Sequence, residues 1–167
     1  MRGEAINQRL VKFIWAAAIF FAWSLIQGVV QGASPAVRAL IEAGPGHMIS
    51  VAKTHVGLMG WMSLALMAAT YYLVPIFSGK SIVWPKLIEW IFWIFVVCMV
   101  VGDALLITAG VVGGNAFAAG VTGPQLMSIV MPYAMPAGIL CTIAVIAGLM
   151  FVVQILVSLS RGPKAAS

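Results

Sequence analysis

Hydrophobic residues occur along this chain in four long runs, separated by short polar or glycine-rich connections. The runs cover approximately residues 13–31, 50–77, 87–112 and 126–159. A hydrocarbon core about 30 Å thick is crossed by about 20 apolar residues in a helix. The pattern therefore predicts an all-α membrane protein, a single transmembrane domain over residues 1–167 with four transmembrane helices in a bundle.

Two connections carry signals that end or begin a helix. Ser34 suits an N-cap, Pro35 suits the first helical position, and the glycines of segment 44–46 stop the segment. We expect a short helix there, lying on the outer surface of the membrane. The later segment 113–125 is rich in glycine and free of charge, which predicts an outer loop.

The fourth run is longer than one membrane crossing requires. At about 1.5 Å per residue, residues 126–159 would span about 50 Å as one helix. Pro132 and Pro136 disfavour a helix interior. We therefore expect the first turns to form a separate or kinked interfacial piece, with the crossing beginning near Met135.

Composition supports the membrane assignment and excludes other classes. Hydrophobic residues make up 63% of the chain and charged residues 8%, whereas about a quarter of a soluble domain is charged. The net charge of +5 does not indicate a nucleic-acid partner, because the basic residues flank the hydrophobic runs. The two cysteines, Cys98 and Cys141, form no CxxC motif and are expected to be packing residues.

The distribution of basic residues predicts the orientation. Only Arg38 and Lys53 lie on one side of the predicted topology. Under the positive-inside rule, both termini then lie in the cytoplasm. We expect the membrane to be a bacterial-type inner membrane. The first run is longer than the h-region of a secretory signal and is expected to be retained, although small residues at 32–34 would also permit cleavage. The basic residues on the cytoplasmic side are Arg2, Arg9, Lys12, Lys80, Lys86, Arg161 and Lys164.

Polar side chains within the runs are candidates for function. Asp103 is expected about 22 Å from the inner end of the third run, within the hydrocarbon. It could carry protons, accept a hydrogen bond from an imidazole, or be protonated and bonded to a backbone carbonyl. Gln27 and Gln31 are expected to face protein or the outer interface, and Glu89 to be solvated near the inner interface.

His55 begins an apolar stretch and lies about 33 Å from Phe77 along a helix, at the outer edge of the hydrocarbon. Imidazole is the commonest metal ligand and often holds haem iron. Gly57 and Gly60 remove side-chain bulk nearby, which leaves room for a large flat group. Spacing alone favours the simpler alternative, a histidine that is hydrogen-bonded to another helix or hydrated.

The segment THVGLMGWMSLALMAATYYLVP, residues 54–75, resembles the second transmembrane helix of the haem-copper oxidase catalytic subunit (subunit I), in the branch of nitric oxide reductases and C-type oxidases. Only the first four helices of that subunit have counterparts here. The resemblance implies that His55 ligates a low-spin haem b near the outer face. The matching residues are His55, Gly60, Trp61, Ala68, Tyr71, Tyr72, Leu73, Val74 and Pro75.

The family's catalytic centre needs further histidines on later helices, and this chain has two histidines in all. No binuclear centre and no copper site are therefore expected. The sixth ligand of a haem would come from a partner chain, from Met135 or Met131, or from His47, in that order of preference. Methionines at this spacing are otherwise a gap-filling stripe.

A haem at His55 would be contacted by Met59 and Met62 on the same helix face, and its propionates could pair with Arg38 and Lys53. Those two cations could equally be membrane anchors. The sequence thus favours a small subunit of a respiratory complex that relays electrons, with other membrane subunits, lipid, and a cytochrome c domain or quinone as partners. The alternative is a cofactor-free structural or assembly subunit.

Overall fold

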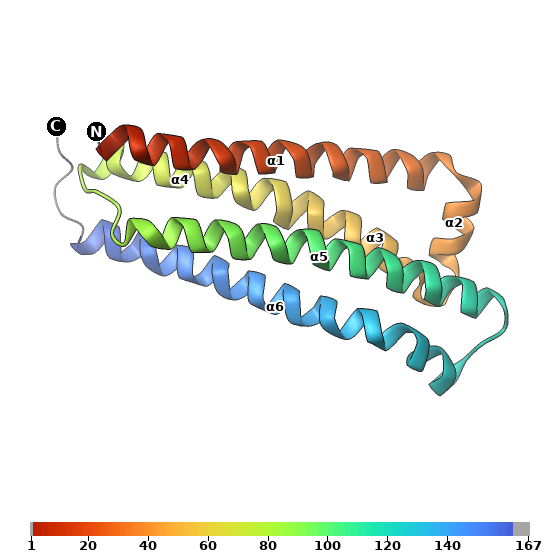
Figure 1. Cartoon of the computed structure of the whole chain (residues 1–167). Coiled ribbons are helices and arrows are strands. Elements are labelled where there is room, and N and C mark those ends of the chain that lie inside the picture. The colour runs from red at the N-terminus through yellow and green to blue at the C-terminus, as the bar shows by residue number, and fades with distance from the viewer. Residues whose placement is uncertain (1, 162–167) are drawn as a thin grey trace.

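The computed structural model describes the backbone of residues 2–161 and the side chains of residues 8–161. Four long helical segments lie side by side, and α1 begins at the end of the molecule where α6 finishes (Figure 1). The short α2 crosses the opposite end (Figure 1). The elements are α1 (Arg2–Ala33), α2 (Pro35–Glu42), the 3-10 helix η1 (Gly44–His47), α3 (Met48–Thr54), the π-helix η2 (His55–Met62), α4 (Ser63–Ser78), α5 (Pro85–Ala118) and α6 (Gly123–Arg161).

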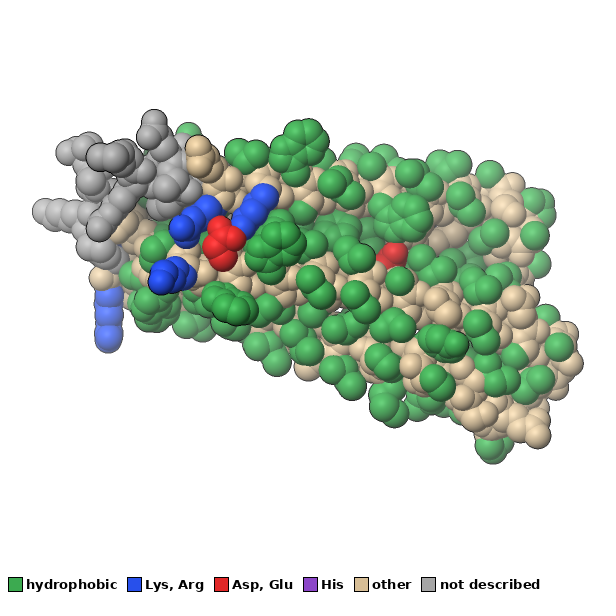
Figure 2. Space-filling view, in the orientation of Figure 1, with side chains coloured by type: hydrophobic (Ala, Val, Ile, Leu, Met, Phe, Trp, Pro, Cys, Tyr) green, Lys and Arg blue, Asp and Glu red, His purple; other side chains and the backbone are tan. Residues whose placement is uncertain are grey.

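Four segments of the described chain are long and apolar enough to cross a membrane: Gln8–Ala33, Gly44–Ser78, Pro85–Ala118 and Gly123–Arg161. The prediction of an all-α chain with four helices of membrane length is confirmed. Hydrophobic side chains cover the outer faces of these helices (Figure 2). An apolar surface this continuous is typical of a protein that contacts lipid.

The short helix α2 begins as the sequence predicts. The Ser34 hydroxyl accepts a 3.3 Å hydrogen bond from the backbone N–H of Val37, and Pro35 occupies the first helical position. Gly44 then adopts a φ of +50°, which favours glycine, and the chain turns into η1. This turn places η1 against α5.

The predicted loop at 113–125 is wrong, because α5 continues to Ala118 and only residues 119–122 connect it to α6. Gly113 and Gly114 are buried in α5. A Cβ atom on Gly113 would lie 2.8 Å from Pro45, and one on Gly114 would lie 3.1 Å from the carbonyl oxygen of Leu40. These glycines therefore allow α2 and η1 to pack closely on α5.

Of the two alternatives for the start of the fourth run, a separate piece is wrong, whereas a kink within one helix stays a prediction. Helix α6 runs without a break from Gly123 through Pro132 and Pro136 to Arg161. At about 1.5 Å per residue its length is about 58 Å, so one part of α6 extends beyond a hydrocarbon core about 30 Å thick. Both prolines are exposed, and α6 packs along α5.

The main core lies among α1, α4, α5 and α6 in the half of the molecule that contains the termini of the described chain. Phe13 contacts Tyr71 edge-on and Phe92 at a tilt, with ring centroids 6.1 Å and 4.8 Å apart. A smaller cluster joins α5 to the first half of α6. The largest fully buried side chains are Tyr71, Phe13, Leu64, Ile88, Ile91, Gln154, Val56 and Ser158.

The side chain of Gln154 on α6 forms hydrogen bonds to α4 and to the connection between α4 and α5. Its side-chain amide donates to the carbonyls of Val83 (2.7 Å) and Trp84 (3.0 Å), and its oxygen accepts from the Tyr71 hydroxyl (2.7 Å). Trp84 has a φ of +49°, which is uncommon for a residue other than glycine. The Gln154 amide thus supports a strained turn at the end of the molecule where α1 begins.

Candidate functional site

His55 is the first residue of the π-helix η2, which sequence reasoning did not predict. A π-helix is rare, and short π segments inside α-helices are frequent at functional sites. The only sequence signal is the pair of glycines, Gly57 and Gly60, because glycine weakens a regular α-helix. Beyond its own helix, η2 packs mainly against α1 and α5.

The imidazole of His55 is half-buried, and its Nδ1 lies 2.9 Å from the carbonyl oxygen of Val51. A carbonyl only accepts, so Nδ1–H is the donor in this hydrogen bond. The neutral ring then carries its lone pair on Nε2. This is the tautomer in which Nε2 can bind a metal while Nδ1–H fixes the ring orientation.

The expectation that Gly57 and Gly60 leave room for a large flat group is wrong. A Cβ atom on Gly57 would lie 2.8 Å from the hydroxyl of Ser24, and one on Gly60 would lie 3.1 Å from the ring of Phe20. Both neighbours belong to α1. The glycines therefore let α1 pack closely against η2, and a cofactor at His55 would need a different side of the helix.

The methionines named as candidate ligands lie on exposed surface. Met131 and Met135 of α6 are 41% and 59% exposed, so they do not fill gaps in the core of this chain. Met62 is also exposed, whereas Met59 is half-buried against the main core. His47 is exposed and its Nδ1 lies 2.9 Å from the carbonyl oxygen of Gly44.

Arg38 and Lys53 lie on α2 and α3, away from the end of the molecule where α1 begins (Figure 1). Arg38 is exposed on α2, and Lys53 is half-buried on α3, two residues before His55. A Cβ atom on Gly28 of α1 would lie 3.8 Å from Cδ of Lys53, so the lysine stem runs against α1. Lys53 is thus nearer than Arg38 to His55 in sequence and on the same continuous helix.

Asp103 joins α5 to α1 within the bundle. Its carboxylate accepts a 2.8 Å hydrogen bond from the indole of Trp23 and two of 3.2 Å from the side-chain amide of Gln27. Asp103 is 7% exposed. The His55 Nδ1–H is bonded to a backbone carbonyl instead, so Asp103 is not the acceptor for that imidazole N–H.

The glutamines of α1 face protein, as the sequence predicts. Gln31 donates to the carbonyl of Ile49 (3.2 Å) and accepts from the hydroxyl of Ser50 (3.3 Å). Gln27 and Gln31 are 6% and 8% exposed. Together with Asp103 they form a polar seam that holds α1 to α3 and α5.

The expectation that Glu89 is only solvated is wrong, because its carboxylate is paired. It forms ion pairs with Lys12 and, at 3.7 Å, with Arg9 of α1. Figure 2 shows basic side chains around an acidic one near the end of the molecule where α1 begins. Of the other basic residues predicted on this side, the side chain of Arg2 and the whole of Lys164 lie outside the described residues.

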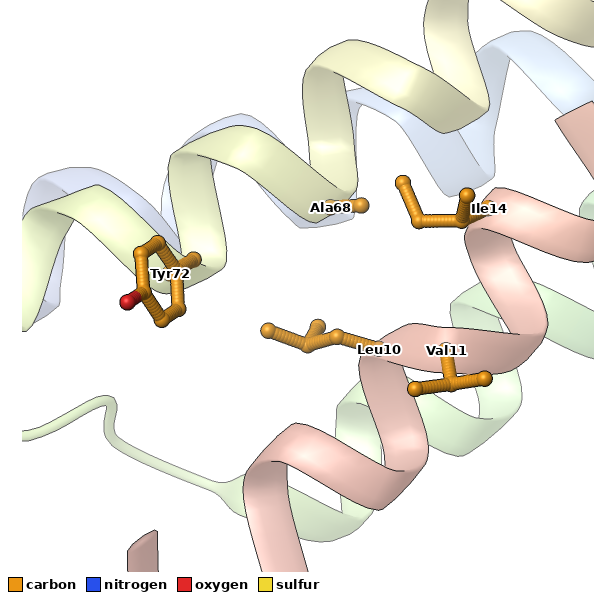
Figure 3. Close-up of a pocket in the computed structure, with 5 residues that line it drawn as sticks. All are labelled: Leu10, Val11, Ile14, Ala68 and Tyr72. Carbon is orange, nitrogen blue, oxygen red and sulfur yellow. The ribbon is translucent and has the colours of Figure 1, made fainter. Parts of the chain in front are cut away.

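Two hollows open on the sides of α1. One, of about 320 Å³, lies between α1 and α4 (Figure 3) and is lined by Leu10, Val11, Ile14, Ala68 and Tyr72. The other, of about 590 Å³, lies mainly between α1 and α5 and reaches Asp103. The cysteines line neither hollow, and both are free thiols, Cys98 buried and Cys141 half-buried.

Comparison of the chain with protein-family models, with curated proteins and with solved structures finds no match. The assignment of function therefore depends on the residues themselves and on their arrangement.

Proposed function

We propose that this chain is a small membrane subunit of a respiratory or electron-transfer complex and that it holds one haem b through Nε2 of His55. The observation that carries the proposal is the 2.9 Å hydrogen bond from Nδ1–H of His55 to the Val51 carbonyl. This bond leaves Nε2 as the free lone pair of the ring. The resemblance of segment 54–75 to the haem-binding helix of haem-copper oxidases supports the same role.

This chain can provide one axial ligand of a haem and part of the surface that would bind it. When bound, a haem supplies one-electron transfer. His55 offers its nitrogen from the first turn of a π-helix, half-buried and with its orientation fixed. Since α1 closes the side of η2 that carries Gly57 and Gly60, the group would lie on another side of η2, against a surface shared with a second chain.

A partner chain is the preferred source of the sixth ligand. Met131 and Met135 are exposed on α6 and follow in preference, and His47 comes last. Arg38 on α2, or Lys53 two residues before His55, could pair with a propionate, although the stem of Lys53 runs against α1. With both termini in the cytoplasm, His55 would lie in the outer half of a bacterial-type inner membrane, near a cytochrome c domain or quinone.

The test is isolation of the full chain from its membrane in mild detergent, followed by measurement of haem per chain and identification of co-purifying chains. His55→Ala should lose the haem. Thr54→Val is the matched control, because it removes the neighbouring side-chain bond to the Ser50 carbonyl (3.0 Å) and should retain haem. A wild-type chain without haem, purified together with its partner subunits, would contradict the proposal.

One observation favours the alternative, a cofactor-free structural subunit. Ser24 and Phe20 of α1 fill the space beside Gly57 and Gly60, so those glycines already have a packing role. Under this alternative the co-purifying chains would be the same, but His55→Ala would change neither the colour of the complex nor its composition.

A further inference from the structure

The larger hollow lies between α1 and α5, and we call it the α1–α5 groove. It has a volume of about 590 Å³, within the range of about 300–1,000 Å³ that is usual for small-molecule sites. Most of its lining is hydrocarbon or aromatic. Its lining includes Ile19, Phe20, Trp23, Val100, Asp103 and Thr108.

Asp103 is the acidic residue of this groove, and its hydrogen bonds suit a carboxylate. Trp23 and Gln27 direct three donor contacts at its two oxygens. An ionised carboxyl group only accepts hydrogen bonds, so these two neutral donor groups match it. Among the described residues, the cations that form ion pairs, Arg9 and Lys12, are both bound to Glu89 rather than to Asp103.

A buried charge without a counter-ion is costly at this depth of a membrane protein. Neutral donors reduce that cost but do not cancel the charge. On the face shown in Figure 2, an acidic side chain lies isolated among hydrophobic ones, away from the basic cluster. A cation arriving through the groove would supply the missing charge.

Two further acceptors belong to Gln27, which binds Asp103, and to Thr108, which lines the groove. The oxygen Oε1 of Gln27 is buried without a hydrogen-bond partner among the described residues, and it belongs to the amide that binds Asp103. The Thr108 hydroxyl donates to the carbonyl of Ala104 (2.7 Å), which leaves its lone pairs free to accept. Phe20 and Trp23 add aromatic rings, which attract cations.

We propose that the α1–α5 groove binds an amphipathic organic ammonium ion, a primary amine with an aliphatic or aromatic body, which enters sideways from the bilayer. The ammonium group donates to Asp103, and the apolar body lies along Ile19 and Val100. Charge complementarity selects this occupant over a neutral lipid chain. The proposal does not depend on a haem at His55, which is not among the residues that line the groove.

The test uses the full chain in nanodiscs of phosphatidylcholine and two photoreactive probes, dodecylamine and dodecanol, each carrying the same diazirine. After irradiation, labelled peptides are mapped by mass spectrometry. The amine should label α1 around residues 19–23 and α5 around residues 100–108 at least tenfold more than the alcohol does. Equal labelling by both probes would overturn the proposal and indicate a groove that holds acyl chains.

Three variants sharpen the result. Asp103→Asn should reduce labelling by the amine to the level of the alcohol, whereas Glu89→Gln, which removes an acid outside the groove, should leave it unchanged. Ala104→Phe keeps the carboxylate but fills the groove with a ring, and it should abolish labelling even if Asp103→Asn fails to fold. Strong labelling of both Asp103→Asn and Ala104→Phe by the amine would refute the site.

Discussion

The indole Nε1 of Trp23 lies 2.8 Å from Oδ2 of Asp103, and this hydrogen bond joins α1 to α5. Trp23 is 42% exposed, so its ring faces outward while its N–H reaches a carboxylate that is 7% exposed. A tryptophan in this position couples an apolar outer face to a polar interior contact. The seam that begins here continues through Gln27 and Gln31 to α3.

Removal of the Trp23 N–H should weaken the contact between α1 and α5. Hydrogen bonds between membrane helices contribute about 0.6 kcal/mol on average and at most about 1.7 kcal/mol, and a carboxylate acceptor favours the upper part of that range. We expect Trp23→Phe to lower the free energy of unfolding by about 1 kcal/mol. Unfolding in mixed detergent micelles measures this, with the more exposed Trp15→Phe as a control that should change little.

Gln154 should contribute more to stability than any exposed glutamine. Gln154→Leu leaves the carbonyls of Val83 and Trp84 and the hydroxyl of Tyr71 without their partner. A buried polar group left unsatisfied costs about 1–3 kcal/mol, so we expect a loss of about 2–3 kcal/mol in the free energy of unfolding. The same unfolding assay applied to Gln125→Leu, at an exposed position of α6, should show a change below about 0.5 kcal/mol. Equal effects of the two substitutions would show that the Gln154 contacts are unimportant.

Glycines inside the helices should differ sharply in their tolerance of alanine. A Cβ atom on Gly110 would lie 2.9 Å from the backbone nitrogen of Ile49, which cannot move without displacing α3. Gly110→Ala should therefore destabilise the protein by about 1–3 kcal/mol through overpacking. A Cβ atom on Gly148 would meet no atom within 4 Å, so Gly148→Ala should stabilise by about 0.5–1 kcal/mol through helix propensity. Thermal unfolding of both variants in one detergent tests whether the two changes in stability have opposite signs.

Elements governed by local chemistry could be predicted from the sequence. The start of α2 depends on Ser34 and Pro35, which act within one turn, and its end depends on a glycine at positive φ. The inward orientation of Gln27 and Gln31 follows from the cost of a polar group in hydrocarbon, whatever the partner is. The four helices of membrane length could be predicted because a segment that crosses the hydrocarbon must itself be apolar.

Features governed by tertiary neighbours could not be predicted. In the sequence, Gly113 and Gly114 have the appearance of loop glycines, because their packing partner η1 is distant along the chain. Gly57 and Gly60 suggest open space beside the helix, because the sequence does not show that α1 fills it. The partners of Asp103 lie on a helix some eighty positions earlier in the chain. Gln154 is hard to single out in the sequence because it is uncharged and lies within a long apolar run, although a buried amide needs hydrogen-bond partners.

The most direct test of a haem ligated by His55 is chemical rescue, measured by the Soret absorbance of the full chain isolated with its partner subunits. The wild type should show the band, His55→Gly should lose it, and added imidazole should restore it by occupying the vacated ligand position. A wild-type complex without the band, or a band of unchanged position and intensity in His55→Gly, would contradict the account.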